Sequence, residues 1–446
     1  MNAPAPLRQL SLVQTASLVI GTVIGSGVFL SLPIVARIGG TPLMTVLIWF
    51  LGGVVWIPQI LILAEMGTAY PIQGGAYYYL NKAGSPFLAF LYTWTAFLTS
   101  DTPTLTIVGL GAISALTFFT PLFGDVLWAR VLASVLILGL SLLHVRSVRT
   151  GGNVQIVLTI AKLTPLMSIV IIGFFYFGSG HLVGGTPSVG AGATFAVITA
   201  GISSTLWSYA GFTNILYMAG EVKRPERTLP IALIGSLVFV MVAYTLISLC
   251  TSAIVPFSQL IGAEGGFINP FAYLGVASKV AGTIFAIAAF ISMIGALNAS
   301  IMAQPRLEYA IARDGLFFRV FGHLHPKYLT PDYSIMIQSA LGIVLFLLGD
   351  IDNMMGYFTL SYALQNTLVY GAIFFLRRRP DYQPTYRAPW WGVMAGLSIL
   401  IQMYVSVGTF MAYPTAGILA SLALILSGLP IYMYYAYRRR TQGELP

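Results

Sequence analysis

The sequence contains little charge, few histidines and a single cysteine. Of its 446 residues, 8% are charged and 57% are hydrophobic, whereas a soluble domain carries about 25% charged residues. This composition excludes a soluble enzyme and predicts an integral membrane protein. Because Cys250 is the one cysteine, an internal disulfide framework and a metal site built from several cysteines are also excluded. The four histidines are scattered or lie in polar loops, so we expect no metal site and no cofactor.

Long apolar runs, separated by polar residues, proline or glycine, predict twelve transmembrane helices. No soluble domain, long linker or low-complexity tract interrupts the series. The approximate centres of the predicted helices are Val23, Val54, Leu98, Leu136, Met167, Leu206, Val242, Ser292, Ile343, Leu368, Gln402 and Ile425.

Lysine and arginine are distributed unevenly between the loops on the two sides of these helices. If both termini are cytoplasmic, all but four of the 22 Lys and Arg residues lie on the inner side. Arg37, Arg130 and Lys279 then lie outside, and Lys162 lies within a span. This asymmetry follows the positive-inside rule and predicts a multi-pass protein of the inner (cytoplasmic) membrane with both ends in the cytoplasm. The net charge of +9 therefore reflects topology, and we expect no nucleic-acid partner.

The first apolar run, residues 12–38, contains the glycine-rich segment GTVIGSGVF (21–29) near its centre. Its glycines and hydroxyl residues weaken the helix where lipid offers no water to replace lost backbone hydrogen bonds. Unwound backbone at this depth is tolerated only when it is buried in protein or faces a water-filled cavity. The segment therefore predicts a broken helix and a small-molecule site near the middle of the membrane. The alternative is close helix packing through small residues.

A second interruption occurs in the sixth span, where LWSYAGFTN (206–214) places Ser, Gly, Thr and Asn within an apolar helix. Breaks at corresponding positions of two five-helix halves predict an inverted repeat with a substrate between the halves. Position alone supports the repeat, because the halves share no convincing residue-by-residue identity. Free N–H groups at one half-helix suit an anion, and open carbonyls at another suit an ammonium group. A zwitterionic amino acid carries both charges on one carbon.

Further motifs occur in a fixed order along nearly the whole chain. Besides the two breaks they are AEMGT (64–68), GGAYYY (74–79), GEVKRPERTLP (220–230), LNAS (297–300), RL (306–307), ARDG (312–315), RPD (379–381) and YRAP (386–389). With this series the chain resembles transporters of the amino acid–polyamine–organocation (APC) superfamily. Within that superfamily it is most similar to the L-type amino acid transporter (LAT) branch and its bacterial homologues.

The resemblance implies an all-α integral membrane fold of twelve transmembrane helices with a LeuT-like 5+5 inverted repeat. Helices one and six are broken, and two more helices follow the repeats. We assign residues 1–180 to the first repeat, residues 190–380 to the second, and residues 390–446 to the last two helices and a cytoplasmic tail.

The resemblance also implies a substrate site at the two breaks. We expect the substrate carboxylate to be held by backbone N–H groups of Gly25, Ser26 and Gly27, with help from the Ser26 hydroxyl. The carbonyls placed to face the substrate ammonium, beside Gly211, belong to Thr22, Ile24, Trp207, Ser208 and Tyr209. Trp207 matches the position of a gating aromatic in relatives. Ordinary packing against lipid or the core is the alternative for this side chain.

Lys162 lies within the fifth span, with apolar residues on both sides. A charged lysine in the middle of a bilayer is costly and marks a functional candidate. Relatives carry a lysine here, where sodium-driven proteins of the same fold bind a cation. Its ammonium is expected to replace that ion by bonding carbonyls of the first broken helix. Loss and recovery of a proton during the cycle, or a side chain that snorkels from a span end, are the alternatives.

Asp101 is a second ionisable residue within a span, and the L-type pattern does not usually place an acid there. It is a candidate for contacting a cationic or polar substrate side chain, carrying a proton or pairing with a buried group; an acid in a wet vestibule is the alternative. The adjacent Ser100 is expected to form the third-helix wall of the site. Asn298 and Ser300 are candidates for lining the substrate or the former cation site, and hydrogen bonding between helices is the alternative for Asn298.

Three charged residues, Glu65, Glu221 and Arg313, lie at predicted cytoplasmic ends of spans. Ion pairs that close an inner gate and ordinary interfacial charges are both compatible with this position.

These observations predict a secondary transporter of L-amino acids that works by alternating access, through sodium-independent exchange of neutral amino acids. A proton-coupled symporter that accepts cationic or polar substrates through Asp101 is one alternative, and a non-transporting amino acid sensor is another. No nucleophile–base set is visible, so we expect no enzymatic activity. Animal L-type relatives bind a glycoprotein heavy chain through a cysteine after the third span. The corresponding loop here, 120–128, has none, so we expect lipid and amino acids as partners and no disulfide-linked heavy subunit.

Overall fold

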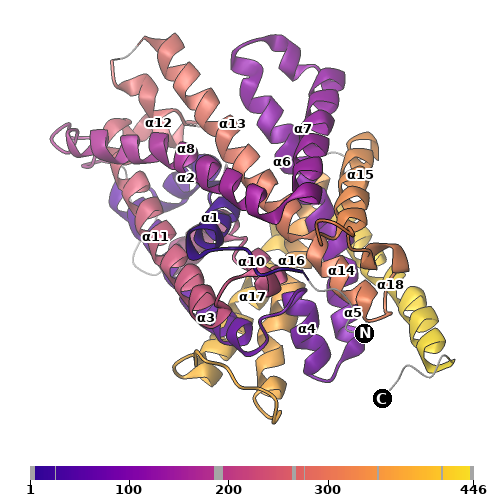
Figure 1. Ribbon diagram of the computed structural model, residues 1–446. Helices are drawn as coiled ribbons and strands as arrows, with labels where there is room; N and C mark the ends of the chain where they lie inside the picture. Colours follow the sequence, from indigo (N-terminus) through magenta and orange to yellow (C-terminus); the bar gives the residue numbers. More distant parts are fainter. Residues whose placement is uncertain are drawn as a thin grey trace.

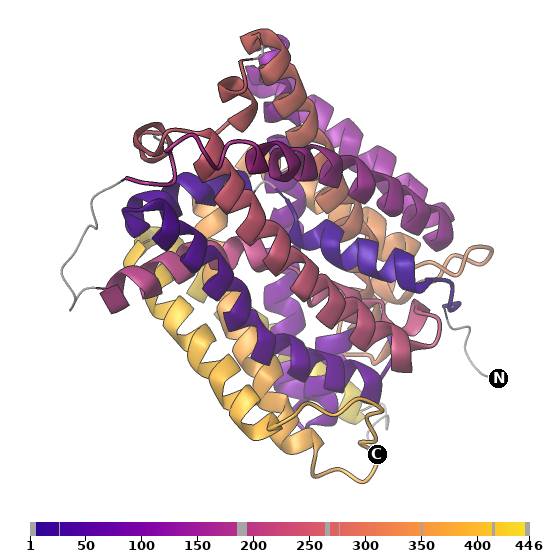
Figure 2. The same cartoon turned by 90° about the vertical axis from the view of Figure 1, so that its left-hand side faces the viewer.

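The computed structural model describes residues 6–25, 27–184, 194–263, 268–275, 277–348, 351–412 and 415–441. Within these ranges the chain is built from helices, and the only strand-like feature is an isolated parallel bridge between Leu10 and Val222. Figures 1 and 2 show the helices packed side by side.

The helices follow the predicted spans closely, with several spans divided into shorter pieces. In chain order they are α1 (Leu12–Val23), α2 (Gly27–Gly39), α3 (Pro42–Ala69), α4 (Gly75–Lys82), α5 (Pro86–Thr95), α6 (Thr102–Ser114), α7 (Val126–Arg146), α8 (Val148–Phe174), α9 (Thr194–Leu206), α10 (Asn214–Tyr217), α11 (Pro225–Ile254), α12 (Phe257–Ile261), α13 (Ser278–Ala303), α14 (Pro305–Arg313), α15 (Asp332–Leu348), α16 (Ile351–Leu376), α17 (Trp391–Ala412) and α18 (Thr415–Thr441).

Within the described residues, five helical segments are long and apolar enough to cross a membrane. They are α3, α7, α8, α11 and the continuous stretch Ser278–Arg313 formed by α13 and α14. Shorter apolar segments lie in α1, α9, α15, α16 and α17. Each of the twelve predicted centres falls on a helical residue. The structure therefore confirms an all-helical, multi-pass membrane protein.

The first predicted span is two helices separated by a short unwound segment. Ser11 and Gln14 form a capping box that starts α1. The helix ends at Val23 because Ile24 adopts an extended conformation, and α2 begins at Gly27. Glycine lowers the cost of leaving the helical conformation, so the glycine-rich segment breaks the helix where the sequence predicts.

The sixth predicted span is broken in a similar way. Helix α9 ends at Leu206 and continues as a single 3₁₀ turn, Trp207–Tyr209. Gly211 then adopts a φ of +117°, which residues with a side chain rarely adopt. The helix resumes at Asn214 as the short α10.

The broken helices lie at the centre of the bundle. Helix α1 packs against α8, α11 and α13, and α2 packs against α9 and α3. Helix α17 packs against α3 on one flank, where Figure 2 shows the orange and yellow C-terminal helices beside indigo α3. The two unwound segments are thus enclosed by other helices rather than exposed to lipid, as buried polar backbone in a membrane requires.

Two buried ion pairs join helix ends at one end of the molecule, which we call the latch end. Arg306 on α14 donates to Glu221 at 2.9 Å, with both side chains at most 1% exposed. Arg377, after α16, donates to the fully buried Glu65 of α3 at 2.7 and 2.8 Å. Gln73, in the turn after α3, also donates to Glu221. Because Glu65 lies near this same end of α3, both ion pairs lie at one end of the molecule. Glu65 and Glu221 are therefore more deeply buried than ordinary interfacial charges. Arg313, by contrast, is exposed.

We expect Arg306→Met to lower the free energy of unfolding by about 3–5 kcal/mol, because it leaves the buried Glu221 carboxylate without its charged partner. Lys82→Met is the matched control, since Lys82 pairs with Asp381 at an exposed site, where a pair contributes about 0–1 kcal/mol. Thermal unfolding of the purified protein in detergent measures both. Equal effects of the two substitutions would contradict the assignment of the buried pair as a latch.

Candidate functional site

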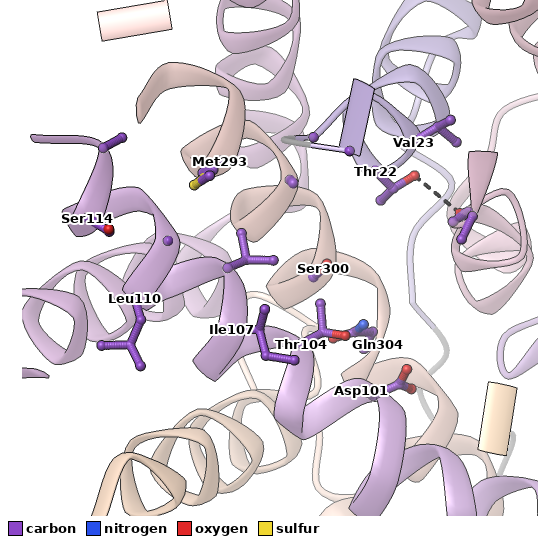
Figure 3. Close-up of a pocket in the computed structure, with 18 of the residues that line it drawn as sticks. Thr22, Val23, Asp101, Thr104, Ile107, Leu110, Ser114, Met293, Ser300 and Gln304 are labelled. Carbon is purple, nitrogen blue, oxygen red and sulfur yellow. Dashed lines mark hydrogen bonds between the residues drawn. The ribbon is translucent and has the colours of Figure 1, made fainter. Parts of the chain in front are cut away.

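A cavity of about 700 Å³ lies between the two helix breaks and helices α6 and α13. Residues from the first break (Thr22, Gly25, Gly27) and from the second break (Ser208, Gly211) line it. Figure 3 shows this arrangement, with apolar side chains of α6 and α13 forming another part of the wall. A volume of this size accommodates a small organic molecule.

Polar side chains tie the two breaks to each other and to their surroundings. The Thr22 hydroxyl donates to the Gly211 carbonyl at 3.2 Å, the contact drawn in Figure 3. The Tyr244 hydroxyl lies 3.2 Å from the Val23 carbonyl and 3.1 Å from the Ser208 carbonyl. The Gly211 N–H donates to the hydroxyl of Tyr362 at 3.3 Å. These contacts satisfy backbone groups that the breaks release, and they fix the two unwound segments side by side.

The glycines at the breaks serve two different purposes. A Cβ on Gly27 would lie 2.7 Å from the Ser208 hydroxyl and 2.9 Å from its Cα, so close approach of the two breaks requires glycine there. A Cβ on Gly25 would have no neighbouring atom within 4 Å. Gly25 therefore faces open space in the cavity. Its N–H donates to the Val23 carbonyl at 3.0 Å, so the unpaired N–H groups available to an anion belong to the first turn of α2.

Lys162 lies against the end of α1. Its ammonium donates to the carbonyls of Gly21, at 2.8 Å, and of Ile24, at 2.5 Å, and the residue is 1% exposed. The Ser292 hydroxyl donates to the next carbonyl, of Gly25, at 3.1 Å. Carbonyls at a helix C-terminus lack intrahelical partners and carry partial negative charge. The lysine therefore occupies the position of a cation at the end of a half-helix, and the Ile24 carbonyl contacts Lys162 rather than the cavity.

Several predicted site residues lie outside the cavity wall. Ser100 bonds to the Ala96 carbonyl and to Gln365, which does line the cavity. The Tyr209 hydroxyl donates to the Trp49 carbonyl, away from the break.

Asn298 belongs to a buried network. Its amide nitrogen donates to Gln155 at 2.7 Å, and its amide oxygen lies 3.0 Å from the His144 ring. These contacts match hydrogen bonding between helices, the structural alternative for this residue. Ser300, two positions later, does line the cavity.

Two predicted positions cannot be placed. Ser26 lies outside the described residues. The backbone of Trp207 forms part of the 3₁₀ turn, but its side chain lies outside the described part of the chain, so its role as a gate stays a prediction.

Asp101 lies in a π-helical turn, Ala96–Asp101, inserted between α5 and α6. Such turns are frequent at functional sites because they redirect a side chain out of the regular helical face. Asp101 lines the cavity and is 5% exposed, and its Oδ2 atom accepts no hydrogen bond from the described residues. Figure 3 shows it near Thr104, Gln304 and Ser300. The cavity thus has a carboxyl group with unused acceptor capacity.

The family model for the amino acid permease matches residues 10–441. The chain belongs to the amino acid permease family. This permease is 28% identical over 438 residues to the serine/threonine exchanger SteT of Bacillus subtilis, with 97% of each chain covered. It is 26% identical to the human b(0,+)-type amino acid transporter 1 (96% of this chain and 88% of the relative). It is 24% identical to the human cystine/glutamate transporter (96% and 85%).

Family membership makes the permease a membrane transporter of the APC superfamily rather than an enzyme. Its site also uses residues that sequence reasoning missed. Tyr244 and Tyr362 hold the breaks, and Gln304 and Gln365 line the cavity. The glutamines carry a weak signal, since amides are uncommon in apolar helices. The tyrosines carry none, because the chain has 24 of them.

We expect Gly27→Ala to lower the free energy of unfolding of the permease by about 1–3 kcal/mol, the usual cost of forcing extra volume into a packed site. Gly25→Ala is the matched control and is expected to change it by no more than about 1 kcal/mol, because the new methyl group enters open space. Thermal unfolding in detergent compares them. If Gly25→Ala were the more destabilising, the breaks would not be packed as described.

Proposed function

We propose that this permease exchanges L-amino acids across the cytoplasmic membrane by alternating access and without sodium. The contact of the Lys162 ammonium with the Gly21 and Ile24 carbonyls carries the proposal. A resident ammonium at the end of α1 supplies the positive charge that a bound sodium ion would otherwise bring there. Transport then needs no sodium gradient, and exchange is the simplest mode that remains.

The substrate is held between the breaks by its backbone charges. The N-terminal turn of α2, starting at Gly27, suits the carboxylate because unpaired N–H groups and the helix dipole favour an anion. Carbonyls of the second break suit the ammonium. One of them, of Ser208, already accepts from Tyr244, and the neighbouring Ala210 also lines the cavity. The side chain of the substrate then points along the apolar wall of α6 and α13.

The membrane arrangement follows from this assignment. We propose twelve spans in a 5+5 inverted repeat, with residues 1–180 and 190–380 as the repeats and residues 390–446 as two added helices and a tail. The Thr22–Gly211 contact, which pairs the two breaks, supports this symmetry. The excess of Lys and Arg at the latch end supports a cytoplasmic location for that end and for both termini. We also propose that no disulfide-linked heavy subunit is attached.

A second candidate function is favoured by Asp101. Asp101 lines the cavity and its Oδ2 atom has no hydrogen-bond partner among the described residues, so the carboxyl group is a candidate for pairing with a cationic or polar substrate side chain or for binding a proton carried with the substrate. Relatives differ in what their names say they transport: serine and threonine in one case, cystine and glutamate in another. The substrate class of this permease therefore depends on its own cavity.

Counterflow in proteoliposomes tests the exchange proposal. We expect labelled neutral amino acids to enter vesicles preloaded with unlabelled amino acid, at the same rate in sodium and choline buffers, and to stay out of empty vesicles. Uptake into empty vesicles driven by a pH gradient would instead identify a proton-coupled symporter. Substrate binding with no counterflow would identify a sensor.

Asp101→Asn tests the second candidate. We expect this substitution to weaken competition by lysine or arginine about tenfold or more, because a hydrogen bond to a charged group contributes about 1.5–3 kcal/mol. Competition by neutral amino acids should stay unchanged. Asp125→Asn is the matched control, since Asp125 is an exposed helix cap and asparagine caps equally well. An equal loss for neutral and cationic competitors would contradict a role in side-chain selection.

A further inference from the structure

Glu308 is a buried acid that the proposed transport mechanism does not use. It lies on α14, is fully buried, and neither of its carboxylate oxygens accepts a hydrogen bond from another described residue. An isolated, desolvated carboxylate is strongly disfavoured, and such a group becomes neutral instead. The charged residue beside it in sequence, Arg306, is already paired with Glu221.

Three polar residues at four-residue spacing connect Glu308 to the cavity. Ser300 and Gln304 line the cavity, and Glu308 follows one helical turn later. Gln304 has helical backbone angles at the start of α14, so Gln304 and Glu308 share a helical face. The Gln304 Oε1 atom also has no donor among the described residues, although the residue is 3% exposed. Gln304 and Asp101 both line the cavity and are labelled in Figure 3.

This group of residues consists of acceptors without a donor. Asp101 Oδ2, Gln304 Oε1 and both Glu308 oxygens lack hydrogen-bond donors within the described residues. A proton on Glu308 removes its charge and creates an O–H donor one turn from the Gln304 acceptor.

Among the described residues, no helix that packs against α14 offers Glu308 a cation. Helix α14 packs against α4, α5, α13, α15 and a 3₁₀ turn, Arg319–Gly322. The titratable groups of α4 and α5 have other surroundings: Tyr77 donates to Asp314, Lys82 pairs with Asp381, Tyr92 bonds to Tyr217, and the Tyr79 hydroxyl lies near Gly67. On α15 Asp332 bonds to His323, and Arg319 is exposed. Lys279 lies at the far end of α13.

We propose that Glu308 is a proton-binding site that must be occupied for the latch end to close. The proposal rests on the latch end being the cytoplasmic gate of the proposed exchanger. When that end opens, water reaches Glu308, its O–H bond breaks and the proton passes to cytoplasmic water. Before closure, one Glu308 oxygen regains a proton from the same water. The proton returns to the side from which it came, so closure depends on internal pH while no net proton crosses the membrane.

The accessibility of the latch end tests this without any substrate. A single cysteine, Ala303→Cys, is placed in a Cys250→Ala background, because Ala303 is 2% exposed and lies between Ser300 and Glu308. We expect alkylation from the inside to speed up as internal pH rises from 6 to 9. Ionisation of the cysteine thiol alone accounts for part of this increase in alkylation rate. In the same background Glu308→Gln, which is neutral at every pH and keeps a donor, should leave only that part. Glu226→Gln, an exposed acid on α11, is the matched control.

Exchange in proteoliposomes provides the second measurement. We expect the rate to fall by about tenfold per pH unit once internal pH exceeds the range in which Glu308 stays protonated, and to stay constant when only external pH changes. Glu308→Gln should exchange at the wild-type low-pH rate at every internal pH.

The outcomes separate the two proposals. If neither the alkylation rate nor the exchange rate of the wild-type protein changed with internal pH, the proton site would be overturned, even if Glu308→Gln failed to fold. A Glu308→Gln protein that keeps the wild-type pH profile would also overturn it. Absence of exchange at every pH, together with pH-dependent alkylation that Glu308→Gln abolishes, would reject the exchanger and keep the proton site.

Discussion

The structure depends on how unwound backbone is satisfied within a lipid bilayer. A break in a membrane helix releases N–H and carbonyl groups that lipid cannot hydrogen-bond, so protein groups or a ligand must contact them. Lys162 and Ser292 contact the end of α1, Tyr244 bridges the carbonyls of both breaks, and Thr22 and Tyr362 contact Gly211. These contacts occupy many of the N–H and carbonyl groups that the breaks release. The first turn of α2 and part of the second break are left facing the cavity. The proposed binding site is therefore the portion of the broken backbone that the protein itself does not satisfy.

Buried charge in this protein occurs in two forms. Glu65, Glu221 and Lys162 each have a partner of opposite charge or polarity within hydrogen-bond distance. Asp101 Oδ2 and both Glu308 oxygens have no partner among the described residues. The contrast matters because a paired ion holds two elements together, whereas an unpaired acid must find a ligand. Asp101 lines the cavity, where a substrate group is its proposed ligand, whereas Glu308 is fully buried and is the proposed proton site.

The sequence predicts the features that break a local rule. Three glycines in an apolar run predict the first break, a polar interruption predicts the second, and a lysine among apolar residues predicts a special role for Lys162. The π-helical turn before α6, the short helices α4, α10 and α14, and the tyrosine contacts were not predicted, because they depend on which helices become neighbours. Glu308 was missed for a related reason. It lies beside Arg306 and near Arg313 in a segment assigned to a cytoplasmic loop, where an acid is expected to be hydrated, and only packing against α4, α5 and α15 buries it.

Glu221 and Glu308, both at the latch end, respond differently to opening. Separating Glu221 from Arg306 exposes both ions to water, and the hydration that each regains offsets most of the lost attraction. The ion pair therefore holds the two elements together when the latch end is closed. Glu308 has no counter-charge to regain on closing, so its charged form favours only the open state. Two groups on the same short helix thus have different effects on closure. The Arg306–Glu221 ion pair stabilises the closed latch end, whereas protonation of Glu308 controls whether that end closes.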